Sequence, residues 1–142
     1  MMNSGTIRVV DLDSTVSDDK WRQWLIDPQA EDGENKYHAY HIHCDRDSAI
    51  NRHIVDESPV PVFFVTARPE YVRQKITNWL REKNFKYQAL IMRPNGNHQH
   101  SVDLKRKLIS DLLMMFEIER AYDDRADIIE MCKELGLRGI LV

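Results

Sequence analysis

The stretch that decides the fold is Val9-Val10-Asp11-Leu12-Asp13-Ser14-Thr15. It completes a β-branched apolar run that starts at Ile7, and such a run is typical of a buried strand. Side chains alternate along a strand, so Asp11 and Asp13 point the same way. Two carboxylates on one side of a strand end are costly unless a cation lies between them, and Mg²⁺ prefers oxygen ligands. The stretch alone leaves two alternatives open, a magnesium site and a surface turn with two solvated aspartates.

The composition is that of one globular domain over residues 1–142, with 42% hydrophobic and 30% charged residues. The net charge of −3 supplies no overall basic field for nucleic acid. The two cysteines, Cys44 and Cys132, form no Cys-x-x-Cys pair, as expected of reduced thiols. We find neither an apolar run of membrane-spanning length nor a signal peptide. We therefore expect a cytoplasmic protein without membrane contact, and no stable protein partner is indicated.

The apolar patterning predicts alternating strands and helices. Strands are expected at residues 6–12, 60–65, 87–92, 118–122 and 138–142. Helices are expected at about 45–57, 69–84, 101–115 and 126–135. Residues 14–58 form an insertion after the first strand, irregular as far as Tyr40, in which we expect Trp21 and Trp24 to be buried anchors. The alternation predicts an α/β fold with a mostly parallel five-stranded sheet and helices on both faces.

Polar residues follow three of these strands directly. They are Asp11 and Asp13, Thr66 and Arg68, and Asp123 and Asp124. Ligands of open α/β sheets bind beyond the carboxyl ends of the strands, where the strand order reverses. The shared edge therefore favours the metal site over the surface turn. Four carboxylates with a hydroxyl and cations suit phosphoryl transfer, in which a carboxylate attacks phosphorus while Mg²⁺ neutralises the phosphate oxygens.

With Lys105 on a later helix, these residues resemble the four motifs of haloacid dehalogenase (HAD) superfamily phosphohydrolases, in order and spacing, over nearly the whole chain. The resemblance implies a three-layer Rossmann-like fold, a Mg²⁺ cofactor and an aspartyl-phosphate intermediate. It implies that Asp11 is the nucleophile, Asp13 the general acid and base, and Thr66 and Lys105 the groups that hold phosphate oxygens. The implied metal ligands are Asp11, the backbone carbonyl of Asp13, and the pair Asp123 and Asp124, of which either could be the direct ligand.

A narrower resemblance is carried by Cys44-Asp45-x-Asp47-x-x-Ile50-Asn51, Thr66-Ala67-Arg68 and Ala121-Tyr122-Asp123-Asp124-Arg125. These segments look like the 3′-phosphatase domain of bacteriophage polynucleotide kinase. The resemblance implies that the protein binds a 3′-phosphorylated polynucleotide end or nucleotide as its substrate. The implied substrate-binding residues are Ser14, Thr15, Arg22, Ala67, Arg68 and Arg125. We find no Gly-x-x-x-x-Gly-Lys-Ser/Thr loop, so we expect a single phosphatase domain without a kinase domain.

Two other functions remain as alternatives. A nucleotidase or small-metabolite phosphatase of the same superfamily would use the same motifs. A receiver-like phospho-acceptor domain would also carry an acidic pair, an aspartate, a threonine and a lysine on a parallel sheet. Its lysine would follow a strand, whereas Lys105 lies in a helical pattern within a basic run, so the order of the motifs disfavours that domain.

The remaining polar residues receive structural interpretations. Ser14 stands where the HAD family usually has glycine, which affects the turn after Asp13. We expect the pair Asp18-Asp19 to be solvated, and Asp45 and Asp47 to be cap and loop residues. The histidine groups at 41–43 and 98–100 lack the ligand number and spacing of structural zinc. The two histidines near residue 100 could instead touch a substrate phosphate.

Overall fold

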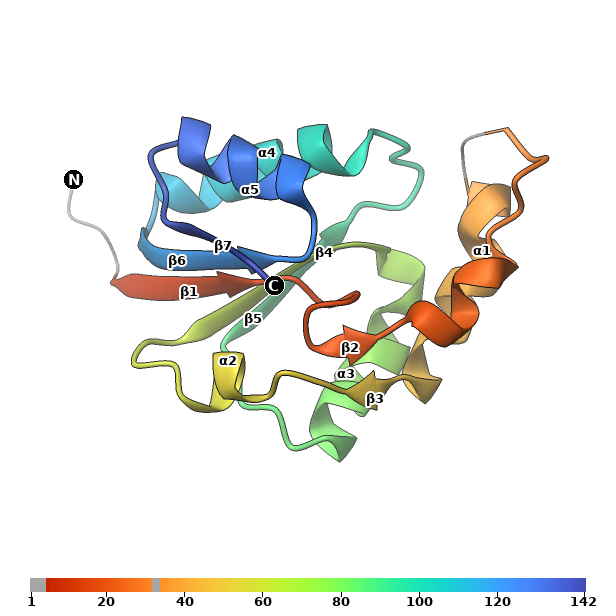
Figure 1. The fold of residues 1–142 in the computed structure, drawn as a ribbon, viewed down its shortest axis with the longest axis horizontal. Helices are drawn as coiled ribbons and strands as arrows, with labels where there is room; N and C mark the ends of the chain where they lie inside the picture. The colour runs from red at the N-terminus through yellow and green to blue at the C-terminus, as the bar shows by residue number, and fades with distance from the viewer. Residues whose placement is uncertain (1–4, 32–33) are drawn as a thin grey trace.

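The principal sheet has five parallel strands, in the order β5-β4-β1-β6-β7. The structure is a computed structural model that describes residues 5–31 and 34–142. The chain starts at the central strand, moves outward on one side and returns to the other (Figure 1). The strands are β1 (Thr6–Val10), β4 (Val62–Pro69), β5 (Ala89–Arg93), β6 (Glu117–Asp123) and β7 (Gly139–Leu141). The order reverses at β1, so the sheet confirms the expected architecture and its switch point.

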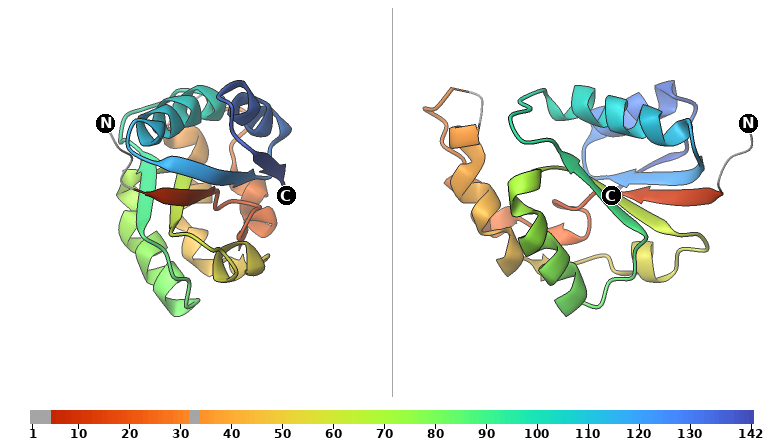
Figure 2. Two further views of the ribbon diagram at one scale, coloured as in Figure 1. Left: turned by 90° about the vertical axis from the view of Figure 1, so that its left-hand side faces the viewer. Right: turned by 180° about the vertical axis from the view of Figure 1, so that it is seen from behind.

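Helices cover both faces of this sheet, giving three layers (Figure 2). One face carries α2 (His53–Asp56) and α3 (Arg73–Glu82), the latter preceded by the 3₁₀ turn η3 (Glu70–Val72). The other carries α4 (Ser101–Leu113) and α5 (Ala126–Glu134). None of the described helices is both long and apolar enough to cross a membrane.

Alternation along the strands divides the core between the two faces. On β1, Val9 packs with α4 and α5, whereas its neighbour Val10 packs on the side of α3. Phe63 and Phe64 of β4 divide in the same way. Strands buried on both faces need apolar side chains at every position, which explains the unbroken apolar run of β4. The core therefore fixes the strand ends, and with them the carboxyl edge of the sheet.

The insertion between β1 and β4 forms its own small unit. It contains a two-stranded antiparallel sheet, two 3₁₀ turns and one further helix. These elements are β2 (Ser17–Asp18), η1 (Lys20–Leu25), α1 (Glu34–Ile42), η2 (Cys44–Arg46) and β3 (Ser48–Ala49). Figure 1 shows α1 beyond the sheet, on the side toward which β1 points.

Three expectations for the insertion were wrong. The stretch expected to be irregular as far as Tyr40 contains β2, η1 and most of α1. The predicted helix over 45–57 is broken into η2, β3 and the short α2, because β3 pairs with β2 and Asn51 has a φ of 49°, outside the helical region. The two tryptophans are not buried anchors, since Trp24 is 78% exposed and Trp21 is 42% exposed. The insertion is instead held by buried polar groups, which the apolar pattern does not reveal.

Candidate active site

The site is centred on Asp11, directly after β1. Its backbone N–H donates to the Tyr122 carbonyl on β6, and its side chain is buried. Thr15 Oγ1 donates to Asp11 Oδ2 at 3.2 Å. Lys105, buried on α4, donates from Nζ to Asp11 Oδ1 at 2.7 Å and to Asp123 Oδ2 at 2.6 Å. One ammonium thus joins the ends of two adjacent strands, and these two carboxylates keep its pKa raised although burial opposes the charge.

Asp124 completes an acidic cluster with Asp11 and Asp123. Ligand oxygens of the three carboxylates lie within 4.8 Å of one another. Burial, together with repulsion from Asp123 and Asp13, raises the pKa of Asp11 well above its usual range despite Lys105. Burial and Asp123 likewise raise the pKa of Asp124 to about 6. Three carboxylates facing one ammonium leave surplus negative charge, so the donor set fits an oxygen-preferring divalent cation such as Mg²⁺.

Asp13 is held in a different environment from Asp11. Its Oδ1 accepts hydrogen bonds from Arg22 Nη2 at 2.7 Å, and from Arg68 Nε at 3.0 Å and Nη2 at 2.6 Å. Burial alone would raise the pKa of Asp13, but the charges of Arg68 and Arg22 hold it well below its usual range. The aspartates flanking Leu12 therefore differ in protonation behaviour, as two distinct chemical roles would require.

Arg22 and Arg68 are fully buried and do not line the cavity. In this structure both guanidinium groups bind Asp13, and their expected contact with substrate stays a prediction. Both also bind Asp47, which accepts from Arg22 Nε at 2.8 Å and from Arg68 Nη2 at 3.3 Å. Ser17 Oγ donates to the same carboxylate at 2.6 Å. Two carboxylates thus compensate two buried guanidinium groups, which would otherwise carry a large desolvation cost.

Sequence reasoning missed the structural roles of Asp47 and Asp19. Asp47 was expected to be a cap or loop residue, and Asp19 was expected to be solvated. Both are buried. Asp19 accepts hydrogen bonds from Ser14 Oγ and, at 2.5 Å, from Tyr40 Oη. Ser14 has a φ of 60°, the left-handed conformation in which glycine is usual, and its bond to Asp19 supports that turn. Asp47 binds Ser17, Arg22 and Arg68, which all lie at least 21 residues away, and Tyr40 lies 21 residues from Asp19. Local spacing carries no signal for these contacts.

The other expected residues divide into two groups around a cavity of about 720 Å³. Thr66 is buried, and its Oγ1 accepts from the Arg68 backbone N–H at 3.1 Å. Arg125 is exposed, and its guanidinium binds Asp127. Of the residues expected from the sequence, those that line the cavity are Asp11, Asp13, Ser14, Ala67, Lys105, Asp123, Asp124 and Arg125. Those that lie beneath its surface are Thr15, Arg22, Thr66 and Arg68.

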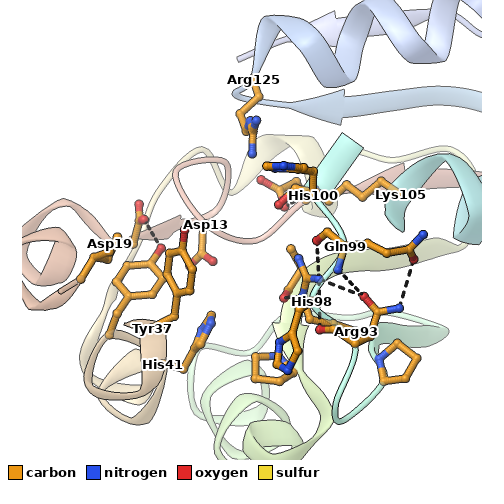
Figure 3. Close-up of a pocket in the computed structure, with 18 of the residues that line it drawn as sticks. Asp13, Asp19, Tyr37, His41, Arg93, His98, Gln99, His100, Lys105 and Arg125 are labelled. Carbon is orange, nitrogen blue, oxygen red and sulfur yellow. Dashed lines mark hydrogen bonds and ion pairs between the residues drawn. The ribbon is translucent and has the colours of Figure 1, made fainter. Parts of the chain in front are cut away.

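The far side of the cavity was not expected from the sequence, apart from the histidines near residue 100. It is formed by aromatic residues of α1 and by the loop that follows β5 (Figure 3). Arg93 holds this loop, because its guanidinium donates to the carbonyl oxygens of Ala67 at 2.8 Å and Gln99 at 2.7 Å. Among the described residues, the metal-ligating geometry is found at the acidic cluster and not at the histidines.

Comparisons with known proteins agree with this fold and identify a family. The family described as "Polynucleotide kinase PNKP phosphatase domain" matches residues 6–142. A chain in the structure of the Pnkp1/Rnl/Hen1 RNA repair complex is 19% identical with a TM-score of 0.71, over 97% of this chain and 42% of that one. A second structure of the Pnkp1/Rnl/Hen1 complex gives 19% identity and a TM-score of 0.72, over 99% and 46%.

A more distant match is a hydrolase from Streptococcus pneumoniae TIGR4, at 12% identity and a TM-score of 0.56, over 100% of this chain and 94% of that one. No curated protein matches. The present chain spans less than half the length of the repair-complex chains that it resembles.

Proposed function

Because this chain belongs to the family of polynucleotide kinase PNKP phosphatase domains, we propose that it hydrolyses 3′-phosphates at polynucleotide ends or on nucleotides. The observation that carries the proposal is Asp11, buried at the end of the central strand and bound by Lys105 beside Asp123 and Asp124. This arrangement supports a Mg²⁺-dependent reaction through an aspartyl-phosphate. The repair complex that contains a structural relative is consistent with a nucleic-acid end as the substrate.

In the proposed first step, the Asp11 carboxylate attacks phosphorus, and the bond from phosphorus to the 3′ oxygen breaks. Mg²⁺ at the acidic cluster would supply positive charge to the phosphate oxygens. Lys105 stays protonated beside Asp11, so its positive charge would stabilise the negative charge of the phosphate oxygens in the transition state. Its hydrogen bonds to both Asp11 and Asp123 keep the nucleophile oriented toward the cavity.

Asp13 is placed to transfer the protons. It lines the same cavity, and its Oδ1 is fixed by two guanidinium groups. It would protonate the departing 3′ oxygen and then accept a proton from the water that hydrolyses the aspartyl-phosphate. The charges of Arg68 and Arg22 hold Asp13 as the carboxylate in the free protein, which is the form that accepts the proton in the second step. For the first step Asp13 must bind a proton before it can donate one, and the negative charge that a bound phosphate ester brings to the cavity would favour that protonated form.

A substrate panel tests the proposal. It compares a 3′-phosphorylated oligonucleotide with 3′- and 5′-mononucleotides, sugar phosphates and p-nitrophenyl phosphate, with and without Mg²⁺. We expect the highest kcat/KM for the oligonucleotide or the 3′-mononucleotide. Preference for 5′-mononucleotides or sugar phosphates would favour the alternative of a nucleotidase or metabolite phosphatase. Stable phosphorylation of Asp11 without turnover would favour a phospho-acceptor domain.

The Asp11→Asn variant tests the nucleophile. The amide keeps the size of the side chain but is a far weaker nucleophile, so we expect turnover to fall by at least about a thousandfold. Far-ultraviolet circular dichroism should show an unchanged fold. Wild-type rates in this variant would show that Asp11 is not the nucleophile.

A further inference from the structure

The cavity extends well beyond the phosphate site. Its catalytic end is formed by the acidic cluster and Lys105, and its other end by α1 and residues 94–100. In Figure 3, Tyr37 and His41 face His98 and His100 across the opening. A volume of about 720 Å³ exceeds what a phosphate needs and lies within the usual range for bound small ligands. The second end therefore has room for the group that carries the phosphate.

Aromatic rings line this second end. His41 lies near Tyr37, with ring centroids 6.1 Å apart, and near Tyr71, with centroids 6.5 Å apart and planes at 85°. Tyr40 packs against His41 with an edge contact at 5.2 Å. All four residues line the cavity, as do Ile26, Pro69 and Pro94. A cavity that joins acidic chemistry to flat apolar surfaces suits a phosphate ester with a planar ring.

His41 contributes an unused polar atom. Its Nδ1 is buried and has no hydrogen-bond partner in the described part of the chain. Burial lowers the pKa of His41 to about 3, so the ring is neutral at physiological pH and can stack without carrying charge. Across the cavity, Asn95 and Gln99 of the loop also line it, and their side-chain oxygens accept hydrogen bonds from the Tyr71 backbone N–H at 3.0 Å and from Asn97 Nδ2 at 3.1 Å, respectively. Amide groups opposite a stacking platform are typical of sites that read the edge of an unstacked base.

We propose that α1 and the loop at residues 94–100 form a slot for the terminal nucleobase of a single-stranded 3′-phosphorylated end, with Tyr37 and His41 as its stacking surface. The proposal rests on the proposed function and adds a base-binding subsite to it. Every base has a π-face, so the slot accepts all four bases with modest preference. A sugar phosphate without a base would leave the aromatic surface uncovered and bind more weakly.

The test measures kcat/KM for two 3′-phosphorylated oligonucleotides that differ only in the last nucleotide, one natural and one abasic. We expect the wild-type protein to prefer the natural end by about tenfold or more, because stacking of one base contributes about 1–3 kcal/mol. Tyr37→Ala and His41→Ala should each reduce this preference severalfold by lowering turnover of the natural end. Tyr37→Phe keeps the ring and should retain the preference.

Asn35→Ala is the matched control, since Asn35 is exposed on the same helix and does not line the cavity. It should keep the wild-type preference for the natural end. Hydrolysis of acetyl phosphate, an activated phosphate without an aromatic ring, reports on the phosphate site, and the slot variants should reduce it far less than they reduce oligonucleotide turnover. Equal turnover of natural and abasic ends by the wild type, or an undiminished preference in both alanine variants, would overturn the slot alone. Hydrolysis of p-nitrophenyl phosphate but of no 3′-phosphorylated nucleotide or oligonucleotide would overturn the proposed function and the slot with it.

Discussion

At the scale of single residues, Lys105 is a buried cation that binds two buried carboxylates. Its ammonium is the cation that the described structure places between Asp11 and Asp123, and all three side chains are buried. The sequence places it in the basic run Lys105-Arg106-Lys107, where any of the three is a candidate. The helical period decides among them, because Leu104, Lys105 and Ile109 are buried whereas Lys107 is exposed.

Replacing Lys105 with methionine tests this interaction. The variant leaves the acidic cluster without its cation, so we expect the free energy of unfolding in EDTA to fall by about 3 kcal/mol or more. We expect kcat to fall by about a hundredfold or more. Urea unfolding and steady-state kinetics are the measurements. Lys107→Met is the control, because Lys107 is exposed and forms a surface pair with Asp111. Equal stability of both variants would contradict the buried bridge.

Because burial lowers the pKa of His41, we expect the free energy of unfolding to depend on pH. The folded-state pKa of His41 is about 3, because burial opposes the charged ring, whereas the value in an unfolded chain is about 6.5. At pH 7 both states hold the ring neutral. As the pH falls below 6.5, the unfolded chain binds a proton that the folded chain does not bind until about pH 3, so the free energy of unfolding decreases throughout that interval.

The measurement is urea unfolding of wild type and His41→Gln at pH 7, 6 and 5 in metal-free buffer. The glutamine does not titrate, so the wild type should lose up to about 1.4 kcal/mol more than the variant for each pH unit well below 6.5. Parallel pH profiles of the two proteins would show that His41 is accessible to protons in the folded state.

At the scale of secondary-structure elements, the strands and helices around the site could be predicted because their apolar periods are strong. α4 was expected at 101–115 and spans Ser101–Leu113, so the position of Lys105 followed from it. The insertion could not be predicted, because its order comes from buried charges. Asp47 meets Arg22 and Arg68 only after the chain has folded, and no local period encodes such a contact.

Asp47→Asn tests how the insertion is attached to the sheet. The substitution removes one of the two carboxylates that compensate Arg22 and Arg68, so we expect the free energy of unfolding to fall by about 3 kcal/mol. We also expect lower kcat, because Arg22 and Arg68 lose the carboxylate that fixes them in position to bind Asp13. Asp45→Asn is the matched control, because Asp45 is exposed and its nearest ion-pair partner is Lys75, at 3.6 Å. Its effect should stay within about 0.5 kcal/mol. Equal losses in both variants would contradict the assignment.

At the scale of the whole molecule, a cation bound at the acidic cluster would link folding to cation binding. Asp11 and Asp123 lie on adjacent parallel strands far apart in sequence, and the fold alone brings them together. A cation that binds only the folded state stabilises it by mass action. The candidate site could be predicted to this extent, because the carboxyl ends of parallel strands share one edge. The aromatic end of the cavity could not, since it depends on the position of α1.

Titration with Mg²⁺ should raise the thermal unfolding midpoint, by the equivalent of about 2.7 kcal/mol at a hundred times the dissociation constant. The shift should shrink below about pH 6, where protonation of Asp124 competes with the cation. Asp124→Asn should weaken the shift, whereas Asp103→Asn, an exposed change on α4, should retain it. A midpoint indifferent to Mg²⁺ in the wild type would argue against a metal site.

The place of β1 has a consequence for how the protein forms. β1 is synthesised before its partners, because its ladders join it to β4 and to β6, which begins at Glu117. One side of the strand that precedes Asp11 therefore stays unpaired until β6 has been synthesised. Contacts of such long sequence separation slow folding. Assembly of the acidic cluster is accordingly a late event, and a nascent chain carries Asp11 without the groups proposed to make it reactive until Lys105, Asp123 and Asp124 have been synthesised.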